Sequence, residues 1–365
     1  MKTFFQKHQK LHIWLLTDLV LLAAYFLCRQ NRTWMNALAE HVTTPLKQAA
    51  GRLCYMTELS IMEVLTALLV IGGIAYAVWS VIAIVRARGY RKSCAYRTVV
   101  RAACIGLSIY AGFCLLWGVN FWTDSFQDKS GIYAEPVAAE DLLKVTVYFA
   151  QQLALASDDV ERTEDGVFAV PREEILARAP HVYDAIEEQF PFLEFEDPGV
   201  KAMRFSYWMS VIDFTGFYCP YTGESNVNVH SPACSLPGTV AHELGHQRGI
   251  ASEQECNFLA VLASVTCDDP AYRYSGWLKG YIHLSNALYS LNRDVYWQLR
   301  DLLPAEVEAD LRYISDYWEQ FRDTKVQQVS TQVYDGVLKA YGDERGIQSY
   351  GTVVDMLVAY YKELT

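Results

Sequence analysis

Acidic residues are scarce in the first third of the chain, and basic residues are scarce in the remainder. Up to Gly118 the sequence contains 13 basic and 4 acidic residues, whereas the rest contains 18 basic and 38 acidic residues. The second part therefore lacks the basic surface that displaces counterions from nucleic acid, which argues against nucleic-acid binding. The basic and apolar first part has the composition of a membrane domain, and the acidic second part that of a soluble domain.

Three long apolar stretches in the first part predict membrane helices at about residues 11–28, 65–85 and 102–122. The second and third stretches contain no charged residue and are long enough to span a bilayer core of about 30 Å. The first stretch has a basic start, as a signal peptide does, but no small-residue cleavage site follows it. We therefore expect an uncleaved helix, in which Asp18 lies in a helix contact or a watery interface rather than acting as a functional carboxylate.

Basic residues predict the orientation of these helices. The linker between the second and third stretches contains no acidic residue and carries Arg86, Arg88, Arg91, Lys92, Arg97 and Arg101. Because cytoplasmic loops are enriched in Lys and Arg, we expect this linker and the N-terminus, with Lys2, Lys7 and Lys10, in the cytoplasm. The expected organisation is a multi-pass domain in the lipid bilayer of the cell membrane, residues 1–125, followed by an extracytoplasmic domain, residues 126–365.

The second domain contains the stretch HELGH, which matches the HExxH motif of zinc peptidases. Pro237 suits the first turn of a helix and Gly249 suits a position just beyond its end, so we expect the motif on a helix. On a helix His242 and His246 lie one turn apart on the same face, where both imidazoles can bind one zinc ion. Glu243 can then reach a zinc-bound water as general base.

A catalytic zinc usually has three protein ligands, so a third ligand is expected downstream of the histidine pair. The metzincin pattern would place a histidine where this sequence has Ser252, which cannot replace an imidazole. Ser252 instead suits the N-cap of a second helix, with Glu255 completing a capping box. Glu253 is then the expected third ligand, and Asn257 one turn later is a hydrogen-bonding partner of the site. Glu255 remains the alternative ligand.

Three stretches resemble a known family: GFYCPYTGESNVN, LPGTVAHELGHQRGIASEQECNFLA and YRYSGWLKG. They are similar to bacterial membrane proteins known as domain of unknown function 3810, and the similarity covers nearly the whole chain. The resemblance implies a zincin-like HExxH site after three membrane helices, without naming a substrate. The run from Glu253 to Asn257 is also similar to the ExxAD and ExxAN helices of gluzincin peptidases, whose first Glu binds zinc, with Cys256 in place of Ala.

Further candidates flank the motif. A Thr-Gly turn followed by alternating residues predicts a small β-hairpin. If its second strand forms a sheet edge, Asn226 and Asn228 line a substrate groove; otherwise they form only the polar face of that strand. Tyr274 and Arg273 are candidates for stabilising the oxyanion of a tetrahedral intermediate, with packing as their alternative role. His283 is expected outside the ligand set, and the cysteine spacing is compatible with disulfides or with free thiols.

These features predict a mainly α-helical protein, with three N-terminal transmembrane helices before a mostly helical zincin-like metallopeptidase domain that includes a small β element. The expected function is hydrolysis of peptide or protein substrates outside the cytoplasmic membrane, with one zinc ion held by His242, His246 and Glu253 and with Glu243 as base. The alternative is a non-catalytic membrane protein that keeps the zinc helix as a structural or sensory element. The intact Glu243 favours the enzyme, because a structural site has no use for a general base.

Overall fold

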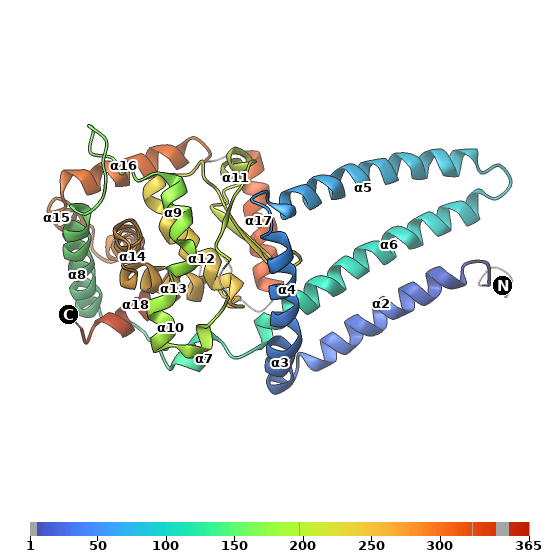
Figure 1. Ribbon diagram of the computed structural model, residues 1–365, viewed down its shortest axis with the longest axis horizontal. Coiled ribbons are helices and arrows are strands. Elements are labelled where there is room, and N and C mark those ends of the chain that lie inside the picture. Colours follow the sequence, from blue (N-terminus) through green and yellow to red (C-terminus); the bar gives the residue numbers. More distant parts are fainter. Residues whose placement is uncertain (1–5, 197, 323, 341–349, 365) are drawn as a thin grey trace. The chain divides into compact units, whose positions relative to one another are not determined.

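The computed structural model describes residues 6–196, 198–322, 324–340 and 350–364, so Lys2 lies outside the described residues (Figure 1). Helices make up 72% and strands 3% of the structure, which confirms the mainly α-helical class. The chain divides into two compact units. The first comprises Met1–Ala50, Ile61–Thr123 and Pro220–Thr222, and the second comprises Gly51–Ser60, Asp124–Cys219 and Gly223–Thr365.

Three helices of the first unit are long and apolar enough to cross a membrane: α2 (Gln9–Cys28), α5 (Ile61–Arg86) and α6 (Arg91–Leu116). α2 and α5 cover the first two predicted stretches. α6 begins and ends earlier than the predicted third stretch, so most of the basic linker is helical and only residues 87–90 connect α5 to α6. Long Arg and Lys side chains can extend toward water, which lets a helix continue beyond its apolar part.

Polar side chains join α2 to α6. The Ser108 hydroxyl lies 3.0 Å from both carboxylate oxygens of Asp18 and donates to them, and the indole nitrogen of Trp14 donates to the same hydroxyl at 2.8 Å. One to two turns nearer the N-terminus, His12 Nε2 lies 2.7 Å from the Tyr96 hydroxyl. Asp18 therefore lies in a contact between helices, which is the environment that the sequence suggested.

The segment between α2 and α5 is helical as well. It forms α3 (Arg32–Leu38), the π-helix η1 (Ala39–Thr43) and α4 (Thr44–Cys54). Asn31 caps α3, because its side chain accepts a hydrogen bond from Trp34 N at 3.1 Å. After α6 the chain continues as a short 3-10 helix, η2 (Gly118–Trp122).

The second unit is a helical assembly with a small sheet. Its helices are α7 (Phe126–Ser130), α8 (Ala139–Ser157), α9 (Arg172–Arg178), α10 (Asp184–Gln189), α11 (Ser206–Val211), α12 (Leu236–Gln247), α13 (Glu253–Thr266), α14 (Pro270–Leu291), α15 (Arg293–Arg300), α16 (Ala305–Glu319), α17 (Lys325–Ala340) and α18 (Tyr350–Tyr361). Short 3-10 turns are η3 (Ala179–His181), η4 (Pro191–Leu193) and η5 (Ala233–Ser235). All nine cysteines of the chain are free thiols.

Helices α12, α13, α14 and α8 pack on one another around the main hydrophobic core. Two glycines on α14 permit this close packing. A Cβ atom on Gly280 would lie 2.2 Å from Phe149 Cε1 of α8, and one on Gly276 would lie 2.7 Å from Ser264 Cβ of α13. Because real Cβ atoms do not approach other atoms so closely, α14 can contact both neighbours only with glycine at these positions.

The sheet has the strand order β1-β3-β2, with β1 (Lys201–Ala202) parallel and β2 (Gly216–Cys219) antiparallel to β3 (Glu224–Val227). The predicted hairpin forms, and Gly223 adopts φ 66° in its turn, a value that favours glycine. β3 is the middle strand, however, so its backbone is paired on both sides. The expectation that this strand offers a free edge for substrate was therefore wrong.

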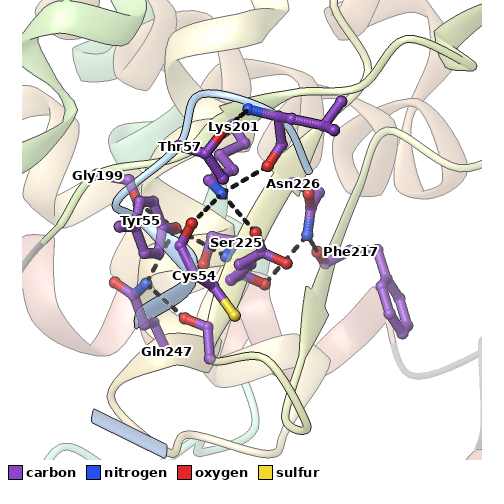
Figure 2. A network of polar contacts seen from close by, with 12 residues as sticks. Cys54, Tyr55, Thr57, Gly199, Lys201, Phe217, Ser225, Asn226 and Gln247 are labelled. Carbon is purple, nitrogen blue, oxygen red and sulfur yellow. Dashed lines mark hydrogen bonds and ion pairs between the residues drawn. The ribbon is translucent and has the colours of Figure 1, made fainter. Parts of the chain in front are cut away.

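Residues Gly51–Ser60 are held in the second unit by a buried network beside the sheet (Figure 2). The ammonium group of Lys201 pairs with Glu224 and donates to the carbonyl oxygens of Cys54 and Leu59 at 2.8 Å. The Tyr55 hydroxyl donates to Gly199 O at 2.8 Å and accepts from the backbone of β3 at 3.0 Å. Burial of a charge is tolerated when it is paired and hydrogen-bonded, as it is here.

Candidate metal centre

Helix α12 carries the HExxH motif and ends where the sequence predicts. Pro237 lies in its first turn. At its end Gly249 adopts φ 89°, and two bonds close the helix: Gly249 N donates to His246 O at 2.9 Å and Ile250 N to Gly245 O at 3.3 Å. This is the Schellman pattern, which needs a left-handed residue and so favours glycine. The chain consequently reverses directly after the second histidine.

The reversal places the start of α13 against the histidine pair. Ser252 caps α13 by accepting from Glu255 N, so the helix begins at Glu253 as predicted. The two carboxylate oxygens of Glu253 then face the two imidazoles. His242 Nε2 lies 3.2 Å from Glu253 Oε2, and His246 Nε2 lies 3.3 Å from Glu253 Oε1.

This triad is compatible with metal binding. One donor atom from each of His242, His246 and Glu253 lies within 4.8 Å of the others. The two imidazoles face different oxygens of Glu253, so the carboxylate lies against both rings. Burial lowers the pKa of His242 to about 4, so its imidazole is neutral. Burial alone would raise the pKa of Glu253, but His246 and His242 hold it well below its usual range, so Glu253 is a carboxylate.

Neighbouring groups orient two of the three side chains. His246 Nδ1 lies 2.8 Å from the carbonyl oxygen of Ile250, so this nitrogen carries a proton and Nε2 is the ring nitrogen that faces Glu253. The thiol of Cys256 lies 3.3 Å from the same Nδ1. Tyr334 of α17 donates its hydroxyl proton to Glu253 Oε1. Such second hydrogen bonds fix the direction of metal-ligating groups.

Glu243 lies beside the triad in an apolar setting. The residue is 4% exposed, and its Oε2 has no hydrogen-bond partner among the described residues. Burial raises the pKa of Glu243 to about 8. Its side chain packs directly on the backbone of β2, because a Cβ atom on Gly216 would lie 2.2 Å from Glu243 Oε1. The deprotonated form of such a group, with an oxygen that no described residue contacts by a hydrogen bond, is a stronger base than a carboxylate in water.

The other predicted residues near the motif serve local structure. Glu255 is buried, and its carboxylate accepts from Phe126 N at 3.1 Å and from both the backbone and the side chain of Gln127 at 3.2 Å. It therefore anchors the first turn of α7 and does not share the triad. The Asn257 side chain makes no hydrogen bond to the triad or to any other part of the chain that the structure describes.

Asn226 and Asn228 are fully buried and hold the sheet together. Asn226 Nδ2 donates to the carbonyl oxygens of Phe217 and Glu224. Asn228 Nδ2 donates to the Ser210 hydroxyl at 2.8 Å, and its side-chain oxygen accepts from the following turn. These bonds correct the expectation that the two amides line a groove.

The structure places Tyr274 in a different neighbourhood from the triad. Its ring stacks on Phe168, its hydroxyl donates to Asp310, and the guanidinium group of Arg162 lies over the ring. The side chain of Arg273 makes no hydrogen bond or ion pair within the described residues. Tyr274 thus has the packing role that the sequence left open.

Three side chains at the triad come from distant elements. Tyr334 lies on α17, and α14 contributes Lys279 and His283: the charge of Lys279 lowers the pKa of His242, and His242 in turn lowers the pKa of His283. The spacing of four residues between Lys279 and His283 places them on one helix face. That spacing was the only local signal, and no sequence pattern linked α17 to the motif.

Comparisons with known proteins give a family without an activity. The family described as "Protein of unknown function (DUF3810)" matches residues 40–358 of the chain, which include α12, α13, α14 and α17. No curated protein matches the chain. No solved structure matches it either.

Proposed function

The chain belongs to the DUF3810 family, and we propose that it is a membrane-anchored, zinc-dependent metallopeptidase. The observation that carries the proposal is the position of Glu243. Its buried carboxyl group has a free oxygen and directly follows the first histidine of the triad. A metal site that serves only structure does not require such a group.

His242, His246 and Glu253 would hold the zinc ion, since two imidazoles and a carboxylate form a ligand set that catalytic zinc sites use. A bound zinc supplies a Lewis acid that polarises a carbonyl group and makes water a nucleophile near neutral pH. Tyr334 and the Ile250 carbonyl support this set by fixing the directions of Glu253 and His246.

Glu243 carries the proton in the proposed reaction. It accepts a proton from the attacking water, whose oxygen bonds to the carbonyl carbon of the peptide, and it delivers that proton to the leaving nitrogen when the C–N bond breaks. Burial favours the first step, because a buried carboxylate is more basic than one in water.

The arrangement of an HExxH helix followed by a helix whose first residue is a glutamate supports a zincin-like, gluzincin type of site. The three apolar helices support anchoring in a lipid bilayer. The basic residues near the α5–α6 turn support a cytoplasmic position for that turn and an extracytoplasmic position for the triad. The substrate would then be a peptide or protein outside the cytoplasm.

Glu243→Gln tests the proposal. The amide keeps the size of the side chain but cannot accept the proton, so peptide hydrolysis should fall about 100-fold or more while zinc content stays unchanged. Hydrolysis is measured on a broad peptide library with the purified full-length protein, and zinc by elemental analysis.

His246→Ala and Glu253→Ala are the matched variants, and both should lose the metal. Retention of zinc by both variants would contradict the ligand set. Folded, zinc-loaded wild-type protein that cleaves no member of the library would point instead to a structural or sensory zinc site.

A further inference from the structure

Helix α14 presents a row of polar side chains to the HExxH helix. The Ser275 hydroxyl accepts a hydrogen bond from Gly238 N in the first turn of α12 at 3.0 Å. Lys279, one turn later on the same face, packs its stem on the same glycine: its Cδ would lie 3.3 Å from a Cβ atom there. Gly238 is four residues before His242. The row therefore runs beside the first histidine of the triad.

The side chain of Lys279 is partly buried. Within the described residues it makes neither a hydrogen bond nor an ion pair. Two other cations of the unit have protein acceptors: Lys201 pairs with Glu224 and donates to two carbonyl oxygens, and Arg248 pairs with Glu187 and donates to Leu193 O. The ammonium group of Lys279 is instead available to an anionic group of a ligand.

Two observations describe the electrostatic surroundings of the Lys279 ammonium group. Burial lowers the pKa of Lys279 to about 8, and the charges of Glu243 and Glu253 act against this lowering. Lys279 thus stays mostly protonated at neutral pH. The charges of both carboxyl groups act on it, although it forms no ion pair with either of them among the described residues. Glu243 Oε2 is unpaired as well.

His283, one turn after Lys279 on α14, does not add a second positive charge. Burial lowers the pKa of His283 to about 3, and Lys279 and His242 add to the effect, so its ring is neutral. The ring makes no hydrogen bond to the described residues. The row therefore offers one positive charge flanked by a neutral group. One ammonium matches one carboxylate, whereas phosphate recognition usually employs the fork of Arg or several backbone amides.

We propose that Lys279 binds a carboxylate of the substrate and thereby places the peptide bond beside it at the triad. The inference rests on the proposed peptidase function and deepens it. Hydrolysis adds water across the C–N bond: the hydroxyl goes to the carbonyl carbon and the proton goes to the nitrogen. When the bound carboxylate is the peptide's C-terminus, the products are a shortened peptide and a free amino acid.

The test is direct binding to the full-length, zinc-loaded Glu243→Gln protein. Pooled random tetrapeptides are prepared with a free C-terminal carboxylate or a C-terminal amide, and retained peptides are measured by equilibrium dialysis and mass spectrometry. The free-acid pool should bind about 10- to 100-fold more tightly, as expected for a charge-assisted hydrogen bond. Lys279→Met should remove this difference, and Lys279→Arg should keep part of it.

Lys144→Met on the exposed face of α8 is the control for a general change in charge, and it should keep the full preference. Zinc content of each variant verifies the fold of the site. Equal binding of both pools, binding of neither pool, or a preference that survives in Lys279→Met would contradict the proposal. If the peptides retained from the amidated pool are enriched in Asp and Glu, and Lys279→Met removes this enrichment, the bound carboxylate is that of a side chain.

The experiments distinguish failure of the carboxylate site from failure of the peptidase function. If the wild-type protein hydrolyses the library but binds both pools equally, the peptidase function stands and the role of Lys279 is wrong. If it hydrolyses nothing but shows the Lys279-dependent preference, the carboxylate site stands and the peptidase function is wrong.

Discussion

Glu243 and Glu253 have the same chemistry in water and opposite proton affinities in this protein. Burial without a partner raises the pKa of Glu243 to about 8, whereas the imidazoles of His246 and His242 overcome burial and hold the pKa of Glu253 well below its usual range. The proposed base, which takes up a proton, and the proposed ligand, which stays an anion, are thus set apart by their neighbours alone. At the residue scale, the division of roles depends on which side chains surround each carboxyl group.

Tyr334→Phe should weaken metal binding. The substitution removes the hydroxyl that donates to Glu253 Oε1, and loss of such an outer hydrogen bond typically lowers metal affinity about 10- to 100-fold. Zinc affinity is measured by competition with a chelator. Tyr313→Phe on α16, where the ring is 41% exposed, is the matched control. Equal affinities in the two variants would show that Tyr334 does not orient the ligand.

Gly216→Ala should lower hydrolysis without removing the metal. A Cβ atom at this position would lie 2.2 Å from Glu243 Oε1 and 2.6 Å from its Cγ, so the carboxyl group must move. Displacement of a catalytic group by about 1 Å can cost about 100-fold in rate. The control is Gly336→Ala on α17, whose Cβ meets no atom within 4 Å. If both alanine variants hydrolyse peptides at the wild-type rate, Glu243 is not held in place by β2.

Local and distant contributions explain which site residues the sequence could predict. His242, His246 and Glu253 follow from helix periodicity, the Gly249 turn and the Ser252 cap, all within one short stretch. Tyr334 and Lys279 come from helices that meet the motif only through tertiary packing, and neither has a local pattern that connects it to zinc chemistry. The central position of β3 likewise depends on pairing with β1, which is too short to recognise in the sequence.

At the scale of elements, α12 and α13 form a helical hairpin whose second helix also anchors α7. Ser252 provides the cap that the sequence predicted, but the other half of the expected capping box is replaced. The carboxylate of Glu255 turns to the first turn of α7 and accepts three hydrogen bonds there. A carboxylate at the start of a helix is favoured both by its free N–H groups and by the helix dipole.

Glu255→Ala should destabilise the second unit and leave the metal bound. The substitution leaves Phe126 N buried without an acceptor, and the free energy of unfolding should fall by about 2 kcal/mol. Denaturant unfolding measures the free energy of unfolding, and elemental analysis of the folded protein measures the metal content. Glu253→Ala serves as the opposite control, because it should empty the site while α7 stays anchored. A metal-free but equally stable Glu255→Ala protein would show that Glu255 is the third ligand.

At the scale of the whole molecule, the chain does not divide at a single boundary. The expected division after residue 125 omits Gly51–Ser60, which belongs to the second unit although it precedes the helix α5. Cys54, Leu59 and Tyr55 supply hydrogen bonds to the buried Lys201 and to β3. A fragment without this segment would leave a buried cation short of acceptors. Composition could not reveal this, since the segment is short and its partners are far away in sequence.

Orientation in the membrane is the last property that the whole chain determines. Because Lys and Arg are retained in the cytoplasm during insertion, the basic residues around the α5–α6 turn should hold that turn inside and leave the triad outside. Reporter cysteines at Leu302 and Tyr90, which are 80% and 59% exposed, test this with a membrane-impermeant maleimide on intact cells. Leu302→Cys should react at once and Tyr90→Cys only after lysis, each compared with the unsubstituted protein. The reverse pattern would place the triad in the cytoplasm and would make its substrates cytoplasmic peptides.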